Sequence, residues 1–381
     1  MNHCTHAITE LWLENFRSYH SLRLQLAPQS VVLTGANGAG KTNILEAISL
    51  FAPGRGFRGA ALSEMDKISD VSPLPFTVSL KIDQPDASLH MGTARDVSAA
   101  RDVRIIKMNG KKVAKQAALT QATCLLWLTP AMDQLFLSGQ SARRKWIDRL
   151  VFAFDPQHAA RVSAYEHAMR ERTRLFKRYQ TPDAQWLDIL ERDMAAHGVA
   201  MIAARLAALQ RIHEAMDTMP NVFPKAALAI HGDTEMLLLR GASALEAEEA
   251  MMQALAHHRS IDARAGRALI GAHKTQVEAW HMGKKIKAEQ GSTGEQKAVL
   301  LSVMLATAVA RSMWFGTPPI VLFDEVVAHL DVEKRQCLFD LIAQTAIQAW
   351  LTGTDASDFS GLAPHATMLK IDGGAAHQLR H

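Results

Sequence analysis

The stretch Gly35-Ala36-Asn37-Gly38-Ala39-Gly40-Lys41-Thr42 fits the pattern G-x-x-x-x-G-K-[ST]. Directly before it, Val31-Val32-Leu33 is a short β-branched and apolar run, which is typical of a buried parallel strand. Directly after it, Ile44, Leu45 and Ile48 recur at helical spacing. The stretch is therefore a glycine-rich turn from a strand into a helix, the setting that a phosphate-binding loop requires.

This loop predicts a site for ATP and Mg²⁺. Glycines let successive backbone N–H groups surround the β-phosphate, and the helix start adds partial positive charge. We expect Lys41 to reach the β- and γ-phosphate oxygens as a catalytic residue, and the Thr42 hydroxyl to bind Mg²⁺. The nucleotide-binding residues predicted here are Gly35, Ala36, Asn37, Gly38, Ala39, Gly40, Lys41 and Thr42.

A second apolar run, Ile320-Val321-Leu322-Phe323, ends in two carboxylates, Asp324 and Glu325. Ligands of parallel sheets bind at the carboxyl ends of the strands. We expect Asp324 to hold Mg²⁺ and Glu325 to orient and polarise the water that attacks the γ-phosphate. A strand end that reaches solvent would explain two acids as well, but their place downstream of a phosphate loop favours catalysis.

The segment Gly291-Ser292-Thr293-Gly294-Glu295-Gln296 precedes a long apolar run, which we interpret as a buried helix capped by Ser292. The unpaired N–H groups of such a helix start can bind phosphate. By itself the segment predicts only a capped helix. Its order in the chain, after the phosphate loop and before the acidic strand and Ala328-His329-Leu330-Asp331, favours a role in the nucleotide site.

Between these motifs, residues 141–219 change to helical spacing, and three prolines divide them into successive helices. The dividing residues are Pro156, Pro182 and Pro220. Strand patterns resume at residues 320–323 and 350–351. We therefore predict an α/β fold whose nucleotide-binding core comes from both chain ends, as residues 1–130 and 266–381, interrupted by a mainly helical lobe at residues 131–265.

Composition places few limits on function. The 381 residues are 48% hydrophobic and 21% charged, with a formal net charge of +4, so any DNA contact must be a local basic patch. The three cysteines lie far apart without metal-ligand spacing, which argues against a disulfide framework or a zinc site. With no secretion signal apparent, we expect a cytoplasmic protein.

The order of motifs resembles that of ABC-type ATPases, in which two heads close on nucleotide. The resemblance implies that Ser292 and Gly294 cover the γ-phosphate bound by the partner copy, and that Asp331 lines the dimer contact. It implies an ATP-dependent homodimer.

A closer resemblance is to the RecF family, over most of the chain. The matching segments are Leu13-Glu14-Asn15-Phe16-Arg17-Ser18-Tyr19, the phosphate loop with the following helix, Gly54-Arg55-Gly56-Phe57-Arg58, Ser141-Ala142-Arg143-Arg144-Lys145-Trp146-Ile147-Asp148, and Gln348-Ala349-Trp350-Leu351-Thr352-Gly353-Thr354-Asp355. The segment Gly271-Ala272-His273-Lys274-Thr275-Gln276 departs from the family's G-P-H-R-x-D. Glu295 and Glu325 also differ from the residues usual in the family.

The RecF resemblance implies a weak, DNA-stimulated ATPase of DNA replication, recombinational repair and the SOS response. It implies binding to gapped or junction duplex and to single strands, and cooperation with RecR and RecO in loading RecA. It also suggests Arg17 as a nucleotide-facing residue.

For DNA contact the sequence itself offers two basic stretches. From them we predict Arg143, Arg144, Arg172 and Arg174 as phosphate contacts, although a solvated helix face would explain either stretch equally well. We expect Trp186 to lie in the core and His273 to have a structural or phosphate-side role.

Three other classes of P-loop protein fit the sequence less well. An ABC transporter motor shares the nucleotide motifs, but it lacks a long helical insertion and usually has a histidine near Thr352-Gly353-Thr354. A chromosome-organising ATPase needs hundreds of heptad residues, for which this chain has no room. A GTPase would carry an N-K-x-D segment, which is absent from the sequence.

Overall fold

The computed structural model describes residues 4–68, 74–98, 102–113, 118–179, 182–327 and 330–379. Ala328 and His329, which precede Asp331 in the predicted motif order, lie outside the described residues.

The chain divides into two compact units. The first comprises Met1–Asp133, Thr218–Pro224 and Leu300–His381, and the second comprises Gln134–Asp217 and Lys225–Val299. A core made from both chain ends with an inserted lobe matches the expected plan. The lobe, however, extends to Val299 instead of ending near residue 265, so the segment that contains Ser292 belongs to the second unit.

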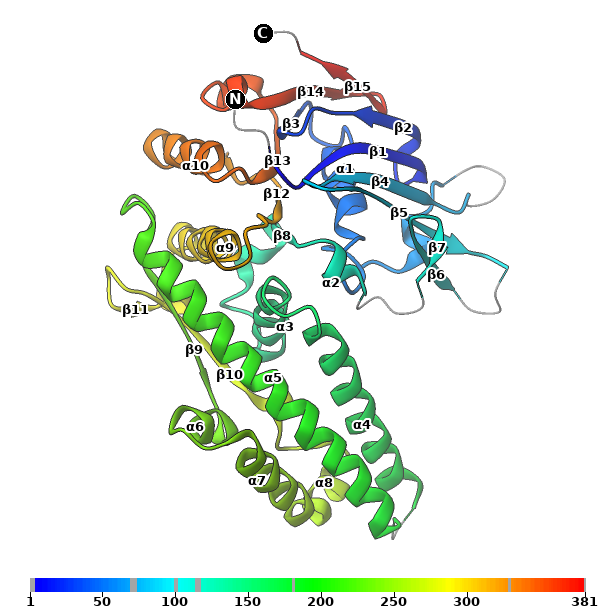
Figure 1. Ribbon diagram of the computed structural model, residues 1–381, viewed down its shortest axis with the longest axis vertical. Coiled ribbons are helices and arrows are strands. Elements are labelled where there is room, and N and C mark those ends of the chain that lie inside the picture. Colours follow the sequence, from blue (N-terminus) through cyan, green and yellow to red (C-terminus); the bar gives the residue numbers. More distant parts are fainter. Residues whose placement is uncertain are drawn as a thin grey trace. The chain divides into compact units, whose positions relative to one another are not determined.

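A mainly parallel sheet in the first unit has the strand order β15-β14-β3-β13-β12-β8 (Figure 1). Its strands are β3 (Ser30–Thr34), β8 (Leu125–Leu128), β12 (Ile320–Phe323), β13 (Gln348–Gly353), β14 (Ala366–Asp372) and the antiparallel edge strand β15 (Ala375–Gln378). All residues of β3, β8 and β12 are buried, as expected for strands covered on both faces. The buried strands predicted at residues 31–33, 320–323 and 350–351 are thus confirmed.

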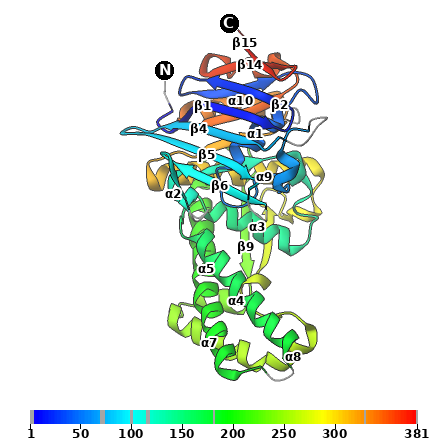
Figure 2. The same ribbon diagram turned by 90° about the vertical axis from the view of Figure 1, so that its right-hand side faces the viewer.

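A second, antiparallel sheet in the same unit has the order β2-β1-β4-β5-β6-β7, and its strands lie side by side in Figure 2. They are β1 (Ala7–Phe16), β2 (Tyr19–Gln25), β4 (Thr77–Asp83), β5 (Ser88–Asp96), β6 (Val103–Met108) and β7 (Lys111–Lys112). Buried and exposed residues alternate along β4, so one face of the sheet packs inward and the other is solvated.

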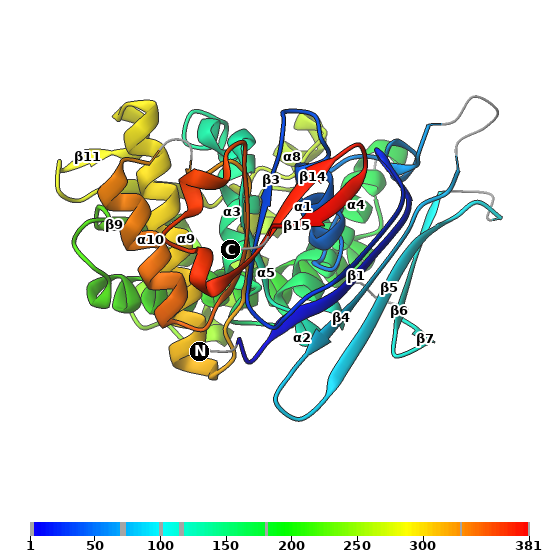
Figure 3. The same cartoon turned by 90° about the horizontal axis from the view of Figure 1, so that it is seen from above.

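Helix α1 (Lys41–Ser49) contacts both sheets, through β1 and β13, and the apolar core of the unit lies around it (Figure 3). A buried amide also joins the sheets. The Gln348 side chain of β13 accepts from the Ile8 N–H at 2.7 Å and donates to the Ile8 carbonyl at 3.0 Å. The first residues of the chain are therefore fastened to a strand near its other end.

The second unit is mainly helical, as predicted. Its helices are α3 (Gln140–Val151), α4 (His158–Arg178), α5 (Ala184–Thr218), α6 (Asp233–Leu239), α7 (Ala244–His257) and α8 (Arg259–Ala265), together with the start of α9 (Thr293–Phe315). Pro156 and Pro182 lie between helices and Pro220 follows α5, as the sequence indicated. A small sheet of β9 (Ala226–His231), β10 (Gln276–His281) and β11 (Ile286–Lys287) completes the unit and was not predicted.

Helix α9 continues into the first unit, where α10 (Val332–Gln344) follows β12. Among the described residues, α9 alone is long and apolar enough to cross a membrane, but 61% of its most apolar window is buried within the protein. We interpret it as the buried helix that the sequence predicted.

A buried ion network holds α4, α5 and α8 together. The Arg172 guanidinium, 1% exposed, donates to Glu191 at 2.8 Å and to Asp262 at 2.7 Å, and both carboxylates are buried as well. The prediction that Arg172 contacts DNA is therefore wrong, because its charge is already neutralised inside the lobe. The prediction that Trp186 lies in the core is also wrong, since this side chain on α5 is 51% exposed.

We expect Arg172→Met to destabilise the lobe by roughly 3–5 kcal/mol, because removing one partner of a buried ion network leaves the carboxylates uncompensated. Arg174→Met is the matched control. Its side chain is 71% exposed and its pair with Glu171 should contribute less than about 0.5 kcal/mol. Urea unfolding followed by circular dichroism should show that the urea midpoint of the first unfolding transition falls for Arg172→Met and not for Arg174→Met. Equal midpoints for the two variants would contradict the structural role of Arg172.

Candidate nucleotide-binding site

The strand order brings three distant parts of the sequence to one edge of the parallel sheet. Strand β13 lies between β3 and β12 and is parallel to both. Their carboxyl ends therefore lie side by side, which is where open α/β sheets bind ligands. The predicted phosphate loop follows β3, Asp324 and Glu325 follow β12, and Thr352 lies near the end of β13.

The loop after β3 depends on glycine at fixed positions. Gly35, Gly38 and Gly40 have φ of 143°, 81° and 106°, in the region that favours glycine. A Cβ on Gly35 would collide with the carbonyl oxygen of Ile371, and one on Gly40 would lie 2.6 Å from the Tyr19 hydroxyl oxygen. The backbone can therefore curl tightly between β3 and α1, as a phosphate loop must.

Lys41 is the first residue of α1 and is 4% exposed. Its ammonium donates to the carbonyl oxygens of Gly35 at 2.7 Å and Ala36 at 2.8 Å, so the side chain lies along the loop. Burial lowers the pKa of Lys41, while the charges of Glu325 and Asp324 oppose that shift. A buried ammonium beside a glycine loop is suited to binding phosphate oxygens.

A chain of hydrogen bonds joins all three strand ends. The Thr42 hydroxyl donates to Asp324 Oδ1 at 2.9 Å, and the Thr352 hydroxyl donates to the same oxygen at 2.9 Å. The Thr352 oxygen in turn accepts from the Glu325 N–H at 2.9 Å. The sequence analysis gave Thr352 no role, although a polar residue at the carboxyl end of the buried 350–351 strand was a signal that could have revealed it.

Two further features characterise the acidic pair. Glu325 has φ of +53°, a conformation that costs a non-glycine residue roughly 1–3 kcal/mol and that is concentrated at functional sites. Burial raises the pKa of Asp324, whereas the hydrogen bonds from Thr352 and Thr42 act in the opposite direction. The two neighbouring carboxylates thus differ in environment, as their predicted separate roles require.

The donor set suits Mg²⁺. Thr42 and Asp324 present oxygen donors next to each other, and Mg²⁺ binds through one or two such oxygens together with substrate phosphates. No group of three or more His, Cys, Asp or Glu residues that could hold a metal occurs in the described parts of the chain. A fully protein-built metal centre is not needed for a P-loop site, because the nucleotide supplies the remaining ligands.

Arg17 is engaged by groups of the protein itself. Its guanidinium donates to both carboxylate oxygens of buried Glu46, at 3.0 and 2.6 Å, and to the Glu64 carbonyl at 2.5 Å. This does not favour the predicted nucleotide contact, and Arg17 instead fastens α1 to β1. Arg58 also donates to Glu46, at 2.8 Å, but is 39% exposed, and its charge opposes the burial that raises the pKa of Asp324. Arg58 was not predicted as a site residue.

Ser292 caps the start of α9, as predicted. Glu295 N–H donates to the Ser292 hydroxyl at 3.4 Å and Ser292 N–H donates to Glu295 Oε2 at 2.7 Å, which is a capping box. A Cβ on Gly294 would meet no atom within 4 Å, so this helix start is open. Asp331 accepts from the Lys334 N–H at 2.9 Å and caps α10 in the same way.

The structure argues against Arg143 and Arg144 as DNA contacts. The Arg143 side chain is 12% exposed, and it donates to the Phe136 carbonyl and to Glu289. Arg144 donates to the Thr275 carbonyl at 3.0 Å. Burial and the charge of nearby Arg205 lower the pKa of Arg144. These predicted contacts are corrected because both guanidinium groups pack within the lobe, and of the four only Arg174 is well exposed.

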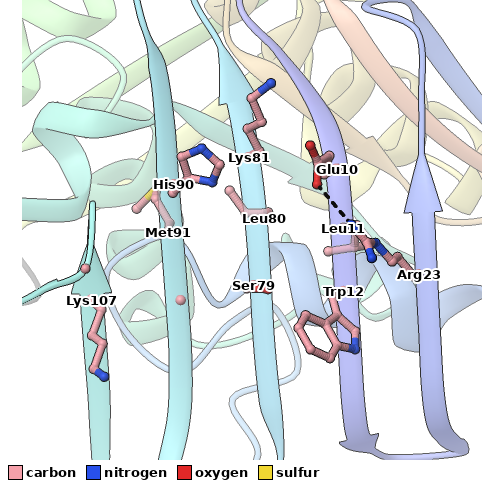
Figure 4. Close-up of a pocket in the computed structure, with 12 residues that line it drawn as sticks. Glu10, Leu11, Trp12, Arg23, Ser79, Leu80, Lys81, His90, Met91 and Lys107 are labelled. Carbon is pink, nitrogen blue, oxygen red and sulfur yellow. Dashed lines mark ion pairs between the residues drawn. The ribbon is translucent and has the colours of Figure 1, made fainter.

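A separate pocket of about 280 Å³ lies on the solvated face of the antiparallel sheet (Figure 4). Trp12, 49% exposed, forms one side of it, and the Arg23 and Glu10 side chains approach to 3.9 Å. The Lys81 ammonium nitrogen lies 3.1 Å from Asp83 Oδ1. None of the predicted nucleotide residues lines this pocket, so it is not part of the site at the strand ends.

The comparisons with known proteins agree with this geometry. A family model described as the RecF/RecN/SMC N terminal domain matches residues 7–362. The DNA replication and repair protein RecF of Mesorhizobium japonicum is 40% identical over 369 residues, 96% of each chain. The protein of the same name from a Caulobacter species is 40% identical over 379 residues, also 96% of each chain.

Solved structures give the same fold. The RecF-ATP structure of the recombination mediator protein RecF has a TM-score of 0.84 at 22% identity and covers 99% of both chains. The Smc head domain from Pyrococcus furiosus has a TM-score of 0.55 at 15% identity. Fold and phosphate loop together define an ABC-type P-loop ATPase. Within that class, the chain belongs to the RecF family.

We expect Thr352→Val to slow ATP hydrolysis by roughly 10- to 100-fold, because it removes hydrogen bonds to the Asp324 carboxylate and the Glu325 N–H. Since the hydrogen bonds of the Thr352 hydroxyl join Asp324 and the Glu325 N–H, ATP affinity should change much less. Thr352→Ser keeps the hydroxyl and should retain most activity. Single-turnover hydrolysis and equilibrium ATP binding measure the two effects, and a valine variant with normal turnover would contradict the role of this hydroxyl.

Proposed function

We propose that this protein is an ATP-dependent DNA-binding protein of replication and recombinational repair, in which weak ATP hydrolysis acts as a switch. The observation that carries the proposal is the hydrogen-bonded chain Thr42–Asp324–Thr352–Glu325 beside the glycine loop. It occurs in a protein about 40% identical, over 96% of both chains, to proteins named for DNA replication and repair.

Different residues of the site bind the phosphates of ATP and activate the attacking water. Lys41 exchanges its carbonyl partners in the loop for β- and γ-phosphate oxygens, and residues 35–40 supply backbone N–H groups to the same phosphates. Glu325 orients the attacking water and accepts its proton. The Glu325 backbone is held in place by its hydrogen bond to Thr352, so little reorganisation is needed when the substrate binds.

Mg²⁺ would be held by Thr42 and Asp324 together with the phosphates, and when bound it neutralises charge on the transferred group. The hydrogen bond between the Thr42 hydroxyl and Asp324 supports this assignment, because it places two hard oxygen ligands next to each other, one at the start of α1 and one after β12.

ATP would also join two copies of the chain. In this proposal Ser292 and Gly294 of one copy approach the γ-phosphate bound at Lys41 of the other, and Asp331 lies at the contact. The open, capped start of α9 supports the idea, since a helix N-terminus carries partial positive charge and free N–H groups. In such a dimer the two copies are related by two-fold symmetry, so each copy contributes the same surface to the contact.

The partner molecules follow from the family. We propose gapped or junction duplex and single-stranded DNA as the ligand, RecR and RecO as protein partners, assistance to RecA loading as the outcome, and the cytoplasm as the location. A transporter motor is not favoured, because the relatives that cover 96% of the chain are named for DNA replication and repair.

We expect Glu325→Gln to retain ATP and to sediment as a dimer with ATP but not with ADP, because hydrolysis is blocked while the phosphate loop is intact. Adding Ser292→Arg should leave a monomer that still binds ATP, since a bulky side chain would enter the facing phosphate site. Ser292→Ala, which trims the same side chain, is the milder control and should weaken dimerisation only partly. Sedimentation velocity at micromolar protein measures all three.

A parent and Glu325→Gln variant that both stay monomeric with ATP, or a Ser292→Arg variant that dimerises normally, would contradict the switch. DNA-stimulated ATP hydrolysis should be lost together with dimerisation in Ser292→Arg.

A further inference from the structure

A pocket of about 340 Å³ in the helical lobe has five arginine or lysine side chains among the nine residues that line it. It lies between α4, the turn after α8 and the short 3₁₀ helix at Ala272–Lys274. The cations that line it are Arg170, Arg174, Lys177, Arg267 and Lys274. No carboxylate is among the residues that line this pocket, so the lining itself carries a net positive charge.

Helical spacing explains how α4 contributes to the pocket. Arg170, Arg174 and Lys177 stand at i, i+4 and i+7 and therefore share one face of the helix. Arg172 lies on another face and is buried in the ion network with Glu191 and Asp262. The same helix thus uses one arginine for stability and presents three other cations outward.

Little within the protein neutralises these charges. In the parts of the chain that the structure describes, Lys177, Arg267 and Lys274 have no carboxylate within ion-pair distance. Arg170 and Arg174 pair with Glu166 and Glu171 on their own helix, and all four of these side chains are at least 30% exposed. Exposed pairs of this kind are weak and can be exchanged for another anion.

The pocket wall that carries Lys274 is held rigidly. His273 Nδ1 lies 2.7 Å from the buried Tyr165 hydroxyl, and His273 Nε2 lies 3.0 Å from the Ala268 carbonyl oxygen. Gly271 has φ of +117°, and a Cβ there would collide with the Tyr165 hydroxyl. The segment at residues 271–276, for which the motifs provided no role, therefore fixes one cation of the pocket at its base.

We propose that this pocket binds the phosphodiester backbone of duplex DNA. The proposal rests on the proposed function and names the surface of the lobe that performs it. The pocket clusters five lysines and arginines, and three of them have no carboxylate partner in the described parts of the chain. Such a cluster matches a closely spaced row of phosphates and holds it without reading bases. The pocket of Figure 4 fits this ligand less well, because Glu10 lines it and two of its cations, Arg23 and Lys81, lie beside carboxylates.

The test measures DNA affinity as a function of salt concentration, by fluorescence anisotropy of a labelled gapped duplex with the full-length protein and ATP. The variant is R267A/K274A. The matched control, R192A/R240A, removes two exposed arginines of the same lobe that do not line the pocket. Because each lost phosphate contact lowers the salt slope by about 0.9, the pocket variant should lose about 1.8 from the slope of log K against log salt. The control should keep the parent slope.

Two additional arms separate the alternatives. R267K/K274R keeps both charges and should restore binding, since phosphate contacts depend on charge more than on residue type. Inorganic tripolyphosphate should compete with DNA on the parent and much less on R267A/K274A. Equal slopes of log K against log salt for the parent and for R267A/K274A would overturn the proposal. It would also be overturned if tripolyphosphate bound in the pocket without displacing DNA. Failure of the parent to bind DNA at all would instead refute the proposed function.

Discussion

The site depends on one shared hydrogen-bond acceptor. Asp324 Oδ1 accepts from Thr42 and Thr352 at 2.9 Å each, and so ties the end of β12 to the start of α1 and to the end of β13. Thr42 and Asp324 are 282 residues apart in the chain. Nothing local holds them together, so the whole parallel sheet must assemble before a phosphate loop and its acidic strand can act as one site.

The helical lobe can be inserted between these strands because the remaining sheet is fastened independently. Gln348 joins β1 to β13 through buried hydrogen bonds, and Arg17 fastens α1 to β1 through buried Glu46. These contacts fix both chain ends in one unit. The lobe then has its own core and its own ion network around Arg172.

The local motifs could be predicted from the sequence, whereas pairings over long distances could not. The phosphate loop, the Asp324 strand and the Ser292 cap depend on neighbouring residues, and periodicity reveals them. Arg172 was misassigned because the acids that neutralise it lie 19 and 90 residues away, and Thr352 was missed because its partners lie on another strand. Trp186 follows an apolar spacing, yet its side chain is 51% exposed, because one sequence alone does not reveal which face of a helix is covered.

The central claim is that ATP binds at the loop between β3 and α1 through Lys41. Isothermal titration of ATP with Mg²⁺ into the parent and into Lys41→Ala tests it most directly, with Lys107→Ala, a change on the antiparallel sheet, as the control. The account predicts that Lys41→Ala weakens ATP binding by roughly 10- to 100-fold, since hydrogen bonds from a charged donor are lost, and that Lys107→Ala binds ATP like the parent. Unchanged ATP affinity in a folded Lys41→Ala protein would contradict it.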